Sequence, residues 1–281
     1  MIIAFPSSPF NRRDPDSHFA NEYAQARDYG IDVALVDHDA LTSGDPSEGV
    51  RKLPKTDDLV YRGWMMTSAE YAAFSWAALM KGASVRTSPA QYKAAHELPG
   101  WAKALEPHTA KTVWTSDSIK DLAGIGQIFG RQPVVLRDFV KSAKGHWKEA
   151  CFIPDAADLP GVCKSVSRFL EIRGSDFTGQ LVFREFETYV APEIRTWWID
   201  GAHELTTPHP DTPEKLPTEF EFPEGLEFSI RELRLPFITV DLAPRDDGIW
   251  RVIELGDGQV SDWPDTFGPV WLSSALARLV P

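Results

Sequence analysis

Short apolar runs alternate with amphipathic stretches over the beginning of the chain. Residues 2–5 and 32–36 are apolar over a few consecutive positions, which is typical of buried strands. Residues 17–29, between them, have the spacing of apolar and polar positions that a helix shows, and Gly30 closes that stretch. This order predicts a βαβ unit at the start of the chain.

The same two kinds of element continue through the middle of the chain. Residues 58–62 are expected to form a strand, and Ser68 is the expected N-cap of a helix that runs to Met80. Another helix, with Gly124 and Gly126 near its end, precedes an apolar strand over residues 133–140. The hydrophobic pattern therefore predicts an α/β beginning followed by α+β structure.

Two further alternating segments, residues 180–187 and 193–202, are expected to be consecutive, partnered strands. Alternation puts Glu193 and Arg195 on the same face of the second strand, and a plain salt-linked sheet face is the alternative to a functional pair. The proline-rich, acidic residues 207–227 are either an insert that faces a substrate or a surface loop.

The clearest local pattern is a hairpin over residues 238–255, with Asp-Gly between two apolar runs. If Asp247 and Gly248 are the two turn residues, the register puts Asp241 directly opposite Glu254. Two anions at cross-strand distance are destabilising unless a positive group lies between them, and a divalent cation with oxygen ligands is the natural candidate. The alternative is a longer loop that offsets the register and leaves both acids in water.

Composition narrows the class of protein. The 281 residues are 43% hydrophobic and 25% charged, which is typical of a globular protein with a sizeable core. The net charge of −12 argues against a sequence-independent nucleic-acid binder. The apolar stretch from Tyr71 to Met80 is too short to cross a bilayer, and the first residues lack the basic region of a secretory signal, so we expect no membrane span and a cytoplasmic location. Two cysteines and seven scattered histidines do not have the spacing of a zinc site.

Basic residues are concentrated between Arg131 and Lys148, in a chain that is otherwise acidic. Residues 142–145, directly after the predicted strand over 133–140, have the composition of a mobile loop that covers phosphates with backbone amides and ammonium groups. A solvated basic turn is the alternative interpretation.

Taken in order, these parts resemble the ATP-grasp superfamily. The resemblance rests on short motifs spread over nearly the whole chain. They are Arg137 with Lys141, Arg184-Glu185-Phe186, Glu193-Ile194-Arg195 through Asp200-Gly201, Asp241, and Glu254-Leu255-Gly256. Within the superfamily the chain looks most like a small, divergent clade of amide or peptide ligases, because Tyr61-Arg62-Gly63 and a late Glu-Leu-x-Asp-Gly-Gln are recurrent there.

The resemblance implies a fold of mixed α/β and α+β type. Residues 1–88 would be an N-terminal α/β domain, residues 89–183 a small lobe with a phosphate-covering loop, and residues 184–281 a C-terminal lobe with a metal-binding hairpin, the two lobes clasping ATP. The implied activity is an ATP- and Mg²⁺-dependent carboxylate-amine ligase that forms ADP through an acyl phosphate. Its partners would be a carboxylate substrate and an amine acceptor that is a small molecule, a peptide or a protein terminus.

The resemblance also implies roles for single residues. Asp241, Glu254 and, less directly, Asp257 would hold Mg²⁺, with Gln259 as an alternative oxygen ligand because Gly256 stands where the family usually has Asn. Arg195 would stabilise the transferring phosphoryl group or the substrate carboxylate, and Arg62 would grip the acceptor. The nucleotide would be bound by Lys111, Arg137, Lys141, Glu185, Phe186 and Glu193.

Alternatives remain open at this point. Arg62 and Lys111 are equally well explained as structural ion-pair partners. The whole chain could also be a nucleotide-dependent enzyme of another class, such as a polynucleotide ligase or a phosphotransferase, or a non-catalytic binding protein that keeps the fold. Trp197, Trp198 and Trp250 are expected in the core rather than on a substrate surface.

Overall fold

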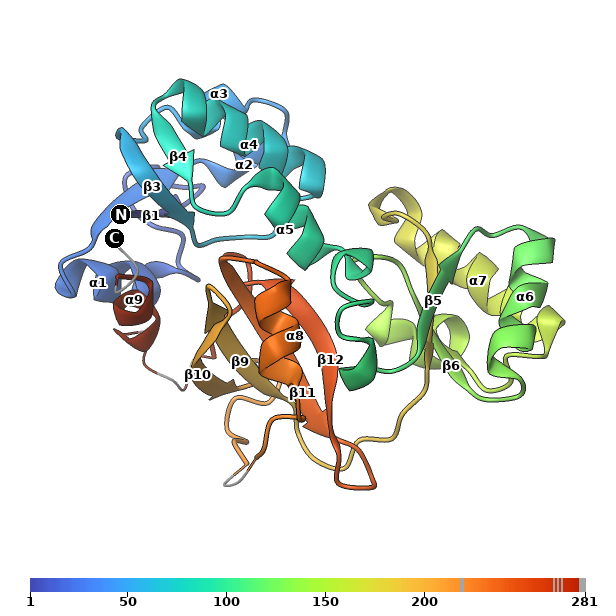
Figure 1. Ribbon diagram of the computed structural model, residues 1–281. Helices are drawn as coiled ribbons and strands as arrows, with labels where there is room; N and C mark the ends of the chain where they lie inside the picture. Colours follow the sequence, from blue (N-terminus) through green and yellow to red (C-terminus); the bar gives the residue numbers. More distant parts are fainter. Residues whose placement is uncertain (218–219, 265, 267, 269, 278–281) are drawn as a thin grey trace. The chain divides into compact units, whose positions relative to one another are not determined.

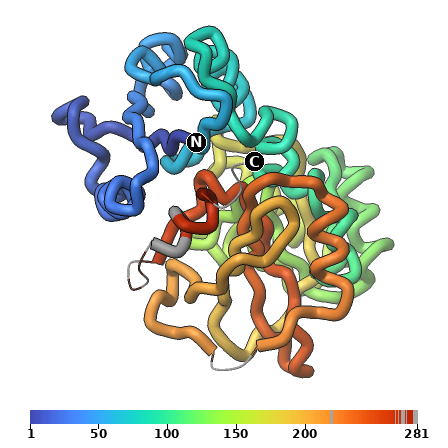
Figure 2. Tube along the Cα trace, turned by 60° about the vertical axis from the view of Figure 1, so that its left-hand side comes forward, coloured from blue at the N-terminus to red at the C-terminus, as the bar shows by residue number. Residues whose placement is uncertain are grey.

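The computed structural model describes residues 1–217, 220–264, 266, 268 and 270–277. The chain forms two compact units. Unit 1 comprises Met1–His96, Pro192–Leu242 and Glu254–Pro281, and unit 2 comprises Glu97–Ala191 and Ala243–Ile253. The colours of Figure 2 follow this path, with blue and red segments in unit 1 and the green segment in unit 2. The domain boundaries expected after residues 88 and 183 stay a prediction.

Unit 1 opens with a four-stranded parallel sheet in the order β2-β1-β3-β4. The strands are β1 (Ile2–Pro6), β2 (Asp32–Val36), β3 (Thr56–Tyr61) and β4 (Ala83–Val85). β1 and β2 pair in register from Ile2 opposite Asp32 to Pro6 opposite Val36, and α1 (Ala20–Asp28) connects them. The predicted βαβ opening is therefore confirmed.

The two faces of this sheet are covered by different helices (Figure 1). The longest is α4, which has Thr67, and not the predicted Ser68, as its N-cap. Glu70 lies three residues after Thr67, so the two side chains satisfy each other's backbone N–H groups as a capping box. The helices that follow α1 in this part of unit 1 are α2 (His38–Thr42), α3 (Pro46–Gly49), α4 (Ser68–Met80) and α5 (Pro89–His96).

Apolar side chains fill both sides of the parallel sheet. Tyr71 and Phe74 of α4 pack on one side with Leu59 of β3. On the other side, α1 and α9 (Val270–Ala277) contribute to a core that also includes Trp197. Since Trp197 belongs to a second sheet of unit 1, the two sheets of this unit share a core. Trp197 and Trp198 are both buried, as predicted.

The second sheet of unit 1 has the order β10-β9-β11-β12. Its strands are β9 (Ile194–Ile199), β10 (Ala202–Pro208), β11 (Phe237–Pro244) and β12 (Trp250–Asp257), and α8 (Leu226–Glu232) packs on β10. The segment 193–202, expected as one strand, turns at Asp200 and Gly201. Both residues have positive φ, 48° and 77°, as a two-residue hairpin turn requires.

The hairpin between β11 and β12 differs from the predicted one in its turn. Gly248 N–H donates to Arg245 O and Arg245 N–H donates to Ile249 O, so the loop has three residues instead of two. Gly248 has φ +86° at the last loop position, which a three-residue hairpin loop favours. A count from this turn therefore no longer places Asp241 opposite Glu254.

Unit 2 contains an antiparallel sheet in the order β5-β8-β6-β7. The strands are β5 (Thr112–Thr115), β6 (Val134–Arg137), β7 (Phe152–Ile153) and β8 (Leu181–Glu185). The expectation that residues 180–187 and 193–202 form partnered strands is wrong. β8 pairs with β5 and β6, while β9 pairs with β10 and β11 in the other unit. Alternation within each segment does not identify its partner.

Two helices pack on the sheet of unit 2, α6 (Ile119–Phe129) and α7 (Leu159–Arg173). The segment that leads into α7 approaches α6 closely at Gly126, where an added Cβ would lie 2.9 Å from Ala157 Cα. Short helical turns fill the connections of this unit, at Leu98–Gly100, Glu106–His108, Lys144–His146, Trp147–Cys151 and Gly174–Asp176. Over the described part of the chain, every helix is too short or too polar to reach across a lipid bilayer.

Candidate active site

An arginine and an aspartate form the centre of the candidate site in unit 1. Arg195 of β9 and Asp241 of β11 are direct cross-strand neighbours. Arg195 Nε and Nη2 each donate to one oxygen of the Asp241 carboxylate, both at 2.8 Å. The side chains are only 12% and 6% exposed. Burial alone would raise the pKa of Asp241, but the forked guanidinium outweighs it and holds that pKa well below its usual range.

Further carboxylates surround the same guanidinium. Burial acts to lower the pKa of Arg195, yet the charge and hydrogen bonds of Asp241, with weaker contributions from Glu254 and Asp262, raise it above its ordinary value. Glu254 and Asp241 therefore share Arg195 as a neighbour. The positive group required by the sequence argument is present here in the protein itself.

His209, which follows β10, completes this cluster. Its Nε2 lies 3.5 Å from Asp241 Oδ2 and 3.8 Å from Glu193 Oε2, and the ring is 8% exposed. The backbone N–H of Asp211 donates to Nδ1 at 3.1 Å, which places the proton of a neutral ring on Nε2. Sequence reasoning missed His209, because it lies in the irregular segment whose path alternation could not predict.

The cluster fits a hard cation through its oxygen atoms. Glu193, His209 and Asp241 each offer one ligand atom, all within 4.8 Å of one another. In the tautomer described, His209 Nε2 carries a proton and offers no lone pair, so carboxylate oxygens are the available ligands. Oxygen ligands of this kind are those that Mg²⁺ prefers. Because Arg195 holds both oxygens of Asp241, a cation bound by that carboxylate would compete with the guanidinium.

Asp257 lies in a different environment from Arg195. It is 1% exposed, and its Oδ1 accepts hydrogen bonds from the backbone and side-chain N–H groups of Gln259. Gln259 in turn contacts Tyr71 of the core around α4. Burial raises the pKa of Asp257 to about 7 despite these hydrogen bonds. The metal-binding role of Asp257 stays a prediction.

Arg62 is surrounded by groups of the protein itself. The side chain is 1% exposed, and Nε and Nη2 form a fork with Glu22 at 2.9 and 2.7 Å. Nη1 donates to the carbonyl oxygens of Gly258, Gln259 and Ser261. These contacts give Arg62 a structural function between α1 and the loop that follows β12. Its role in gripping an acceptor stays a prediction.

The basic residues predicted to bind nucleotide lie in unit 2. Arg137 is 8% exposed and donates from Nε and Nη2 to the carbonyl oxygens of Asp138 and Val140. The buried Asp138 carboxylate accepts from the N–H groups of Val140 and Lys141, which ends the strand at Arg137 and turns the chain. Lys141 is exposed beyond this turn.

Lys111, Glu185 and Phe186 also belong to unit 2. Lys111 Nζ donates to Ile128 O at the end of α6, and it lies 5.2 Å from the ring centre of Phe129. This contact suits a cation at a helix C-terminus. Glu185 ends β8 and is half-buried.

Phe186 packs with two aromatic side chains that the sequence did not single out. Its ring centre lies 5.1 Å from that of Phe152 and 6.4 Å from that of Trp147. Trp147 is 39% exposed, so this cluster presents an aromatic surface to solvent. The segment expected as a mobile loop, residues 142–145, leads into the helical turns that carry Trp147.

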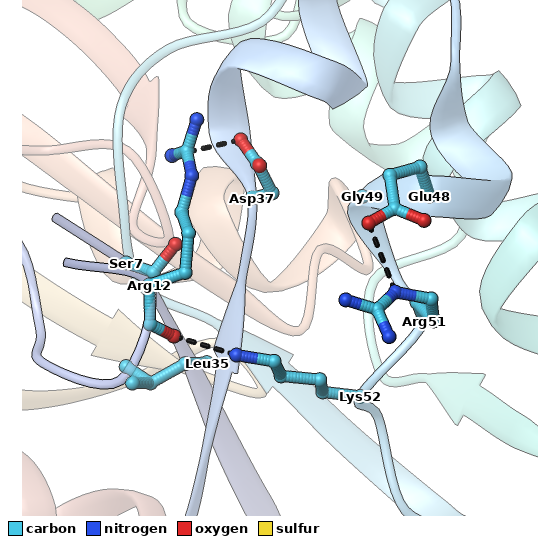
Figure 3. Close-up of a pocket in the computed structure, with 8 residues that line it drawn as sticks. All are labelled: Ser7, Arg12, Leu35, Asp37, Glu48, Gly49, Arg51 and Lys52. Carbon is cyan, nitrogen blue, oxygen red and sulfur yellow. Dashed lines mark hydrogen bonds and ion pairs between the residues drawn. The ribbon is translucent and has the colours of Figure 1, made fainter. Parts of the chain in front are cut away.

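A separate hollow lies at the carboxyl ends of β1 and β2 in unit 1. In Figure 3, Arg12, Arg51 and Lys52 lie around the same open space. Arg12 pairs with Asp37 at 2.9 Å, Arg51 pairs with Glu48 at 2.9 Å, and Lys52 Nζ donates to Arg12 O at 2.7 Å. The cations of this hollow are thus already bound to acidic and carbonyl groups.

Comparisons with known proteins agree with this arrangement. A family model described as an ATP-grasp domain, family 3 of its clade, matches residues 124–279. No curated protein matches the sequence.

Three solved structures illustrate the similarity in fold. D-cycloserine synthetase DcsG is 17% identical, with a TM-score of 0.64 and 99% of each chain covered. The ATP-grasp ligase PsnB, complexed with minimal precursor, Mg and ADP, is 14% identical, with a TM-score of 0.58 and coverage of 99% of this chain and 97% of PsnB. D-alanyl-alanine synthetase A from Vibrio cholerae is 11% identical, with a TM-score of 0.60 and coverage of 99% and 96%. At these identities the similarity shows the fold alone.

Proposed function

Because this chain belongs to the ATP-grasp family, we propose that it is an ATP-dependent ligase joining a carboxylate to an amine. The observation that carries the proposal is the buried fork between Arg195 and Asp241, with Glu193, Glu254 and His209 around it. A cationic group that is fixed in a ring of carboxylates is suited to bind phosphoryl oxygens and a divalent cation together.

In this proposal Asp241 and Glu254 would hold Mg²⁺, which neutralises phosphate charge when it is bound. Arg195 stabilises the phosphoryl group that moves from ATP to the substrate carboxylate. The resulting acyl phosphate reacts with the amine, which forms the C–N bond as inorganic phosphate leaves. The chain thus contributes mainly positioning and charge compensation.

Unit 2 would supply the nucleotide contacts. Trp147 and Phe186 offer an aromatic surface of the kind on which a base stacks, and Glu185 lies next to Phe186 at the end of β8. Exposed Lys141 is the basic residue best placed to reach phosphate, whereas Lys111 and Arg137 would have to leave their present carbonyl partners. We assign residues 89–183 to the small lobe, residues 184–281 to the C-terminal lobe and residues 1–88 to the preceding domain.

One structure of PsnB contains minimal precursor, Mg and ADP, and the names of DcsG and the Vibrio cholerae protein describe synthetases of small molecules. These neighbours support ATP and Mg²⁺ as cofactor and metal. They also support a small molecule, a peptide or a protein terminus as the amine acceptor.

The test is product analysis with the purified full chain. ATP, Mg²⁺ and panels of carboxylic acids and amines are incubated together, and ADP, AMP and phosphorylated products are quantified. We expect ADP formation that requires both an acid and an amine, and that is lost in Asp241→Asn and Glu254→Gln. Asp247→Asn, an exposed carboxylate in the turn of the same hairpin, is the matched control.

Other outcomes would identify the competing functions. AMP release would indicate an adenylating enzyme such as a polynucleotide ligase, and a stable phosphorylated acid would indicate a phosphotransferase. Saturable binding of ATP without any turnover would leave a binding protein that keeps the fold.

A further inference from the structure

Three loops of unit 1 meet beside Arg195. In the sheet order β2-β1-β3-β4 the connections from β1 and from β3 lead in opposite directions, so the sheet has its switch point between these two strands. Ligands of open parallel sheets bind outside the carboxyl ends of the strands at such a point. His18 follows β1, Trp64 follows β3, and Asp262 comes from the loop after β12.

The side chains of these three residues contact one another. His18 Nε2 lies 3.0 Å from Asp262 Oδ1, and the His18 ring packs against Trp64 with ring centres 4.6 Å apart. Trp64 Nε1 donates to Asp16 Oδ2, while Asp16 Oδ1 accepts from the backbone N–H of His18. His18, Trp64 and Asp262 are 40%, 38% and 51% exposed, so a ligand in solvent can reach each of them.

This group is joined directly to the candidate active site. Arg195 Nη1 donates to the backbone carbonyl of Asp262 at 3.0 Å, while the other two guanidinium nitrogens hold Asp241. The loop that carries Asp262 is therefore anchored by the residue proposed to stabilise the transferring phosphoryl group. A ligand held by Asp262 would lie next to that reaction centre.

The local chemistry favours a cation. The carboxylates of Asp262 and Asp16 flank His18 and Trp64, Phe19 adds an apolar edge to Trp64, and the charge of Arg195 is balanced by Asp241. An ammonium group gains from a carboxylate and from the face of an indole together, whereas an anion would be repelled by both carboxylates.

We propose that His18, Trp64 and Asp262 bind the ammonium group of the amine acceptor and that His18 takes its proton. This inference rests on the proposed ligase function and names the part of the site that the second substrate occupies. A carboxylate partner at Nε2 makes that nitrogen the donor, so Nδ1 of the neutral ring is the proton acceptor. Asp262 then has the orienting role that carboxylates commonly have behind a catalytic imidazole.

The proposed step is balanced in protons and electron pairs. One proton moves from the ammonium nitrogen to His18 Nδ1, which frees the lone pair of the amine. That lone pair forms the C–N bond at the acyl carbon, and the bond from this carbon to the phosphate oxygen breaks with its electron pair on phosphate. The second proton of the nitrogen is lost as the tetrahedral centre collapses, and His18 returns its proton to solvent.

Binding can be tested before any natural substrate is known. The probe is butylammonium, with butanol and butyrate as neutral and anionic compounds of similar size, and the readout is the indole N–H signal of Trp64, identified with Trp64→Phe. We expect a saturable shift with butylammonium only, weakened by about tenfold or more in Asp262→Asn, as loss of a charged partner predicts. Asp39→Asn, another exposed carboxylate of the N-terminal segment, is the control. Equal shifts with all three compounds, or no effect of Asp262→Asn, would overturn the proposal.

Proton transfer has its own test once an acid that supports ADP formation is found. Hydroxylamine is largely neutral at neutral pH and captures acyl phosphates without needing a base. We expect His18→Gln to lower amine-dependent turnover by about 100-fold, the lower range for a general base, and to leave hydroxylamine capture unchanged. His203→Gln, in a half-buried histidine of β10, is the control.

The two proposals fail in different ways. Binding of butylammonium without any ADP formation would leave the subsite and remove the ligase. Ligation by His18→Gln at the wild-type rate, or an equal loss of hydroxylamine capture, would remove the proton-transfer role of His18 and leave the ligase.

Discussion

Arg195 Nε and Nη2 hold the two oxygens of Asp241 in a planar fork across β9 and β11, each at 2.8 Å. Both side chains are nearly buried, so neither charge is well solvated. The pair is therefore coupled: each residue is stable in its charged form because the other is present. This relationship determines what substitution of either residue should do.

Removing one member of the pair should cost more than removing both. Arg195→Met leaves a buried carboxylate with His209 as its remaining close partner and should lower the free energy of unfolding by about 3–5 kcal/mol. The double variant Arg195→Met, Asp241→Leu should recover a large part of that loss. Urea unfolding of wild type, both single variants and the double variant measures the coupling, and strictly additive effects would contradict a tight pair.

The same pair predicts the direction of acid sensitivity. The folded-state pKa of Asp241 lies below its unfolded value, so its contribution to stability is complete above the unfolded pKa and is lost as pH falls through the folded pKa. Asp241→Asn should therefore flatten the decline in stability on the acid side. Urea midpoints measured from neutral pH downward check this, and an unchanged decline would show that other carboxylates dominate.

Arg62 should behave as a structural residue. Its fork with Glu22 and its three bonds to carbonyl oxygens are nearly all buried, so Arg62→Met should destabilise the fold by about 3–5 kcal/mol. Arg51→Met removes an exposed pair with Glu48 and should cost at most about 1 kcal/mol. Unfolding by urea compares them. An Arg62 variant of unchanged stability that has lost amine-dependent turnover would instead support the predicted acceptor role.

Asp257 should give the opposite pH dependence from Asp241. Burial raises its folded pKa to about 7, so its contribution to stability is present below the unfolded pKa and is lost as pH rises through about 7. Between an unfolded pKa of about 3.9 and the folded value, the loss is roughly 4 kcal/mol. Asp257→Asn should therefore be relatively more stable than wild type at alkaline than at acidic pH. A constant difference across this range would mean that the carboxyl does not titrate there.

Much of the fold follows from local pattern. The βαβ opening, the strands of the late hairpin and the buried Trp197 and Trp198 were all predictable, because apolar periodicity reports which side of an element is buried. Which sheet a strand joins was not predictable, as β8 and β9 show, because pairing depends on residues far away in the sequence.

The site shows the same division between type and position. Residue types selected Arg195 and Asp241, but the register that places them opposite each other comes from β9 and β11, not from the predicted hairpin count. One extra loop residue before Ile249 shifted that count. His209 lies beyond the end of β10 in an irregular segment, and no periodicity could bring it to Asp241.

Magnesium binding separates the two acidic groups of β12. Glu254 shares Arg195 with Asp241, whereas Asp257 is held by Gln259 among the tyrosines of the α4 core. In calorimetric titrations of Mg²⁺ with ATP, Asp241→Asn and Glu254→Gln should therefore each weaken binding by about tenfold or more, since each removes a charged ligand. Asp257→Asn should leave the affinity close to that of wild type. If Asp257→Asn weakens binding as strongly as the other two, the third metal ligand lies where the family resemblance places it, and the neutral, buried carboxyl described by its contacts must ionise and turn toward the metal when the nucleotide binds.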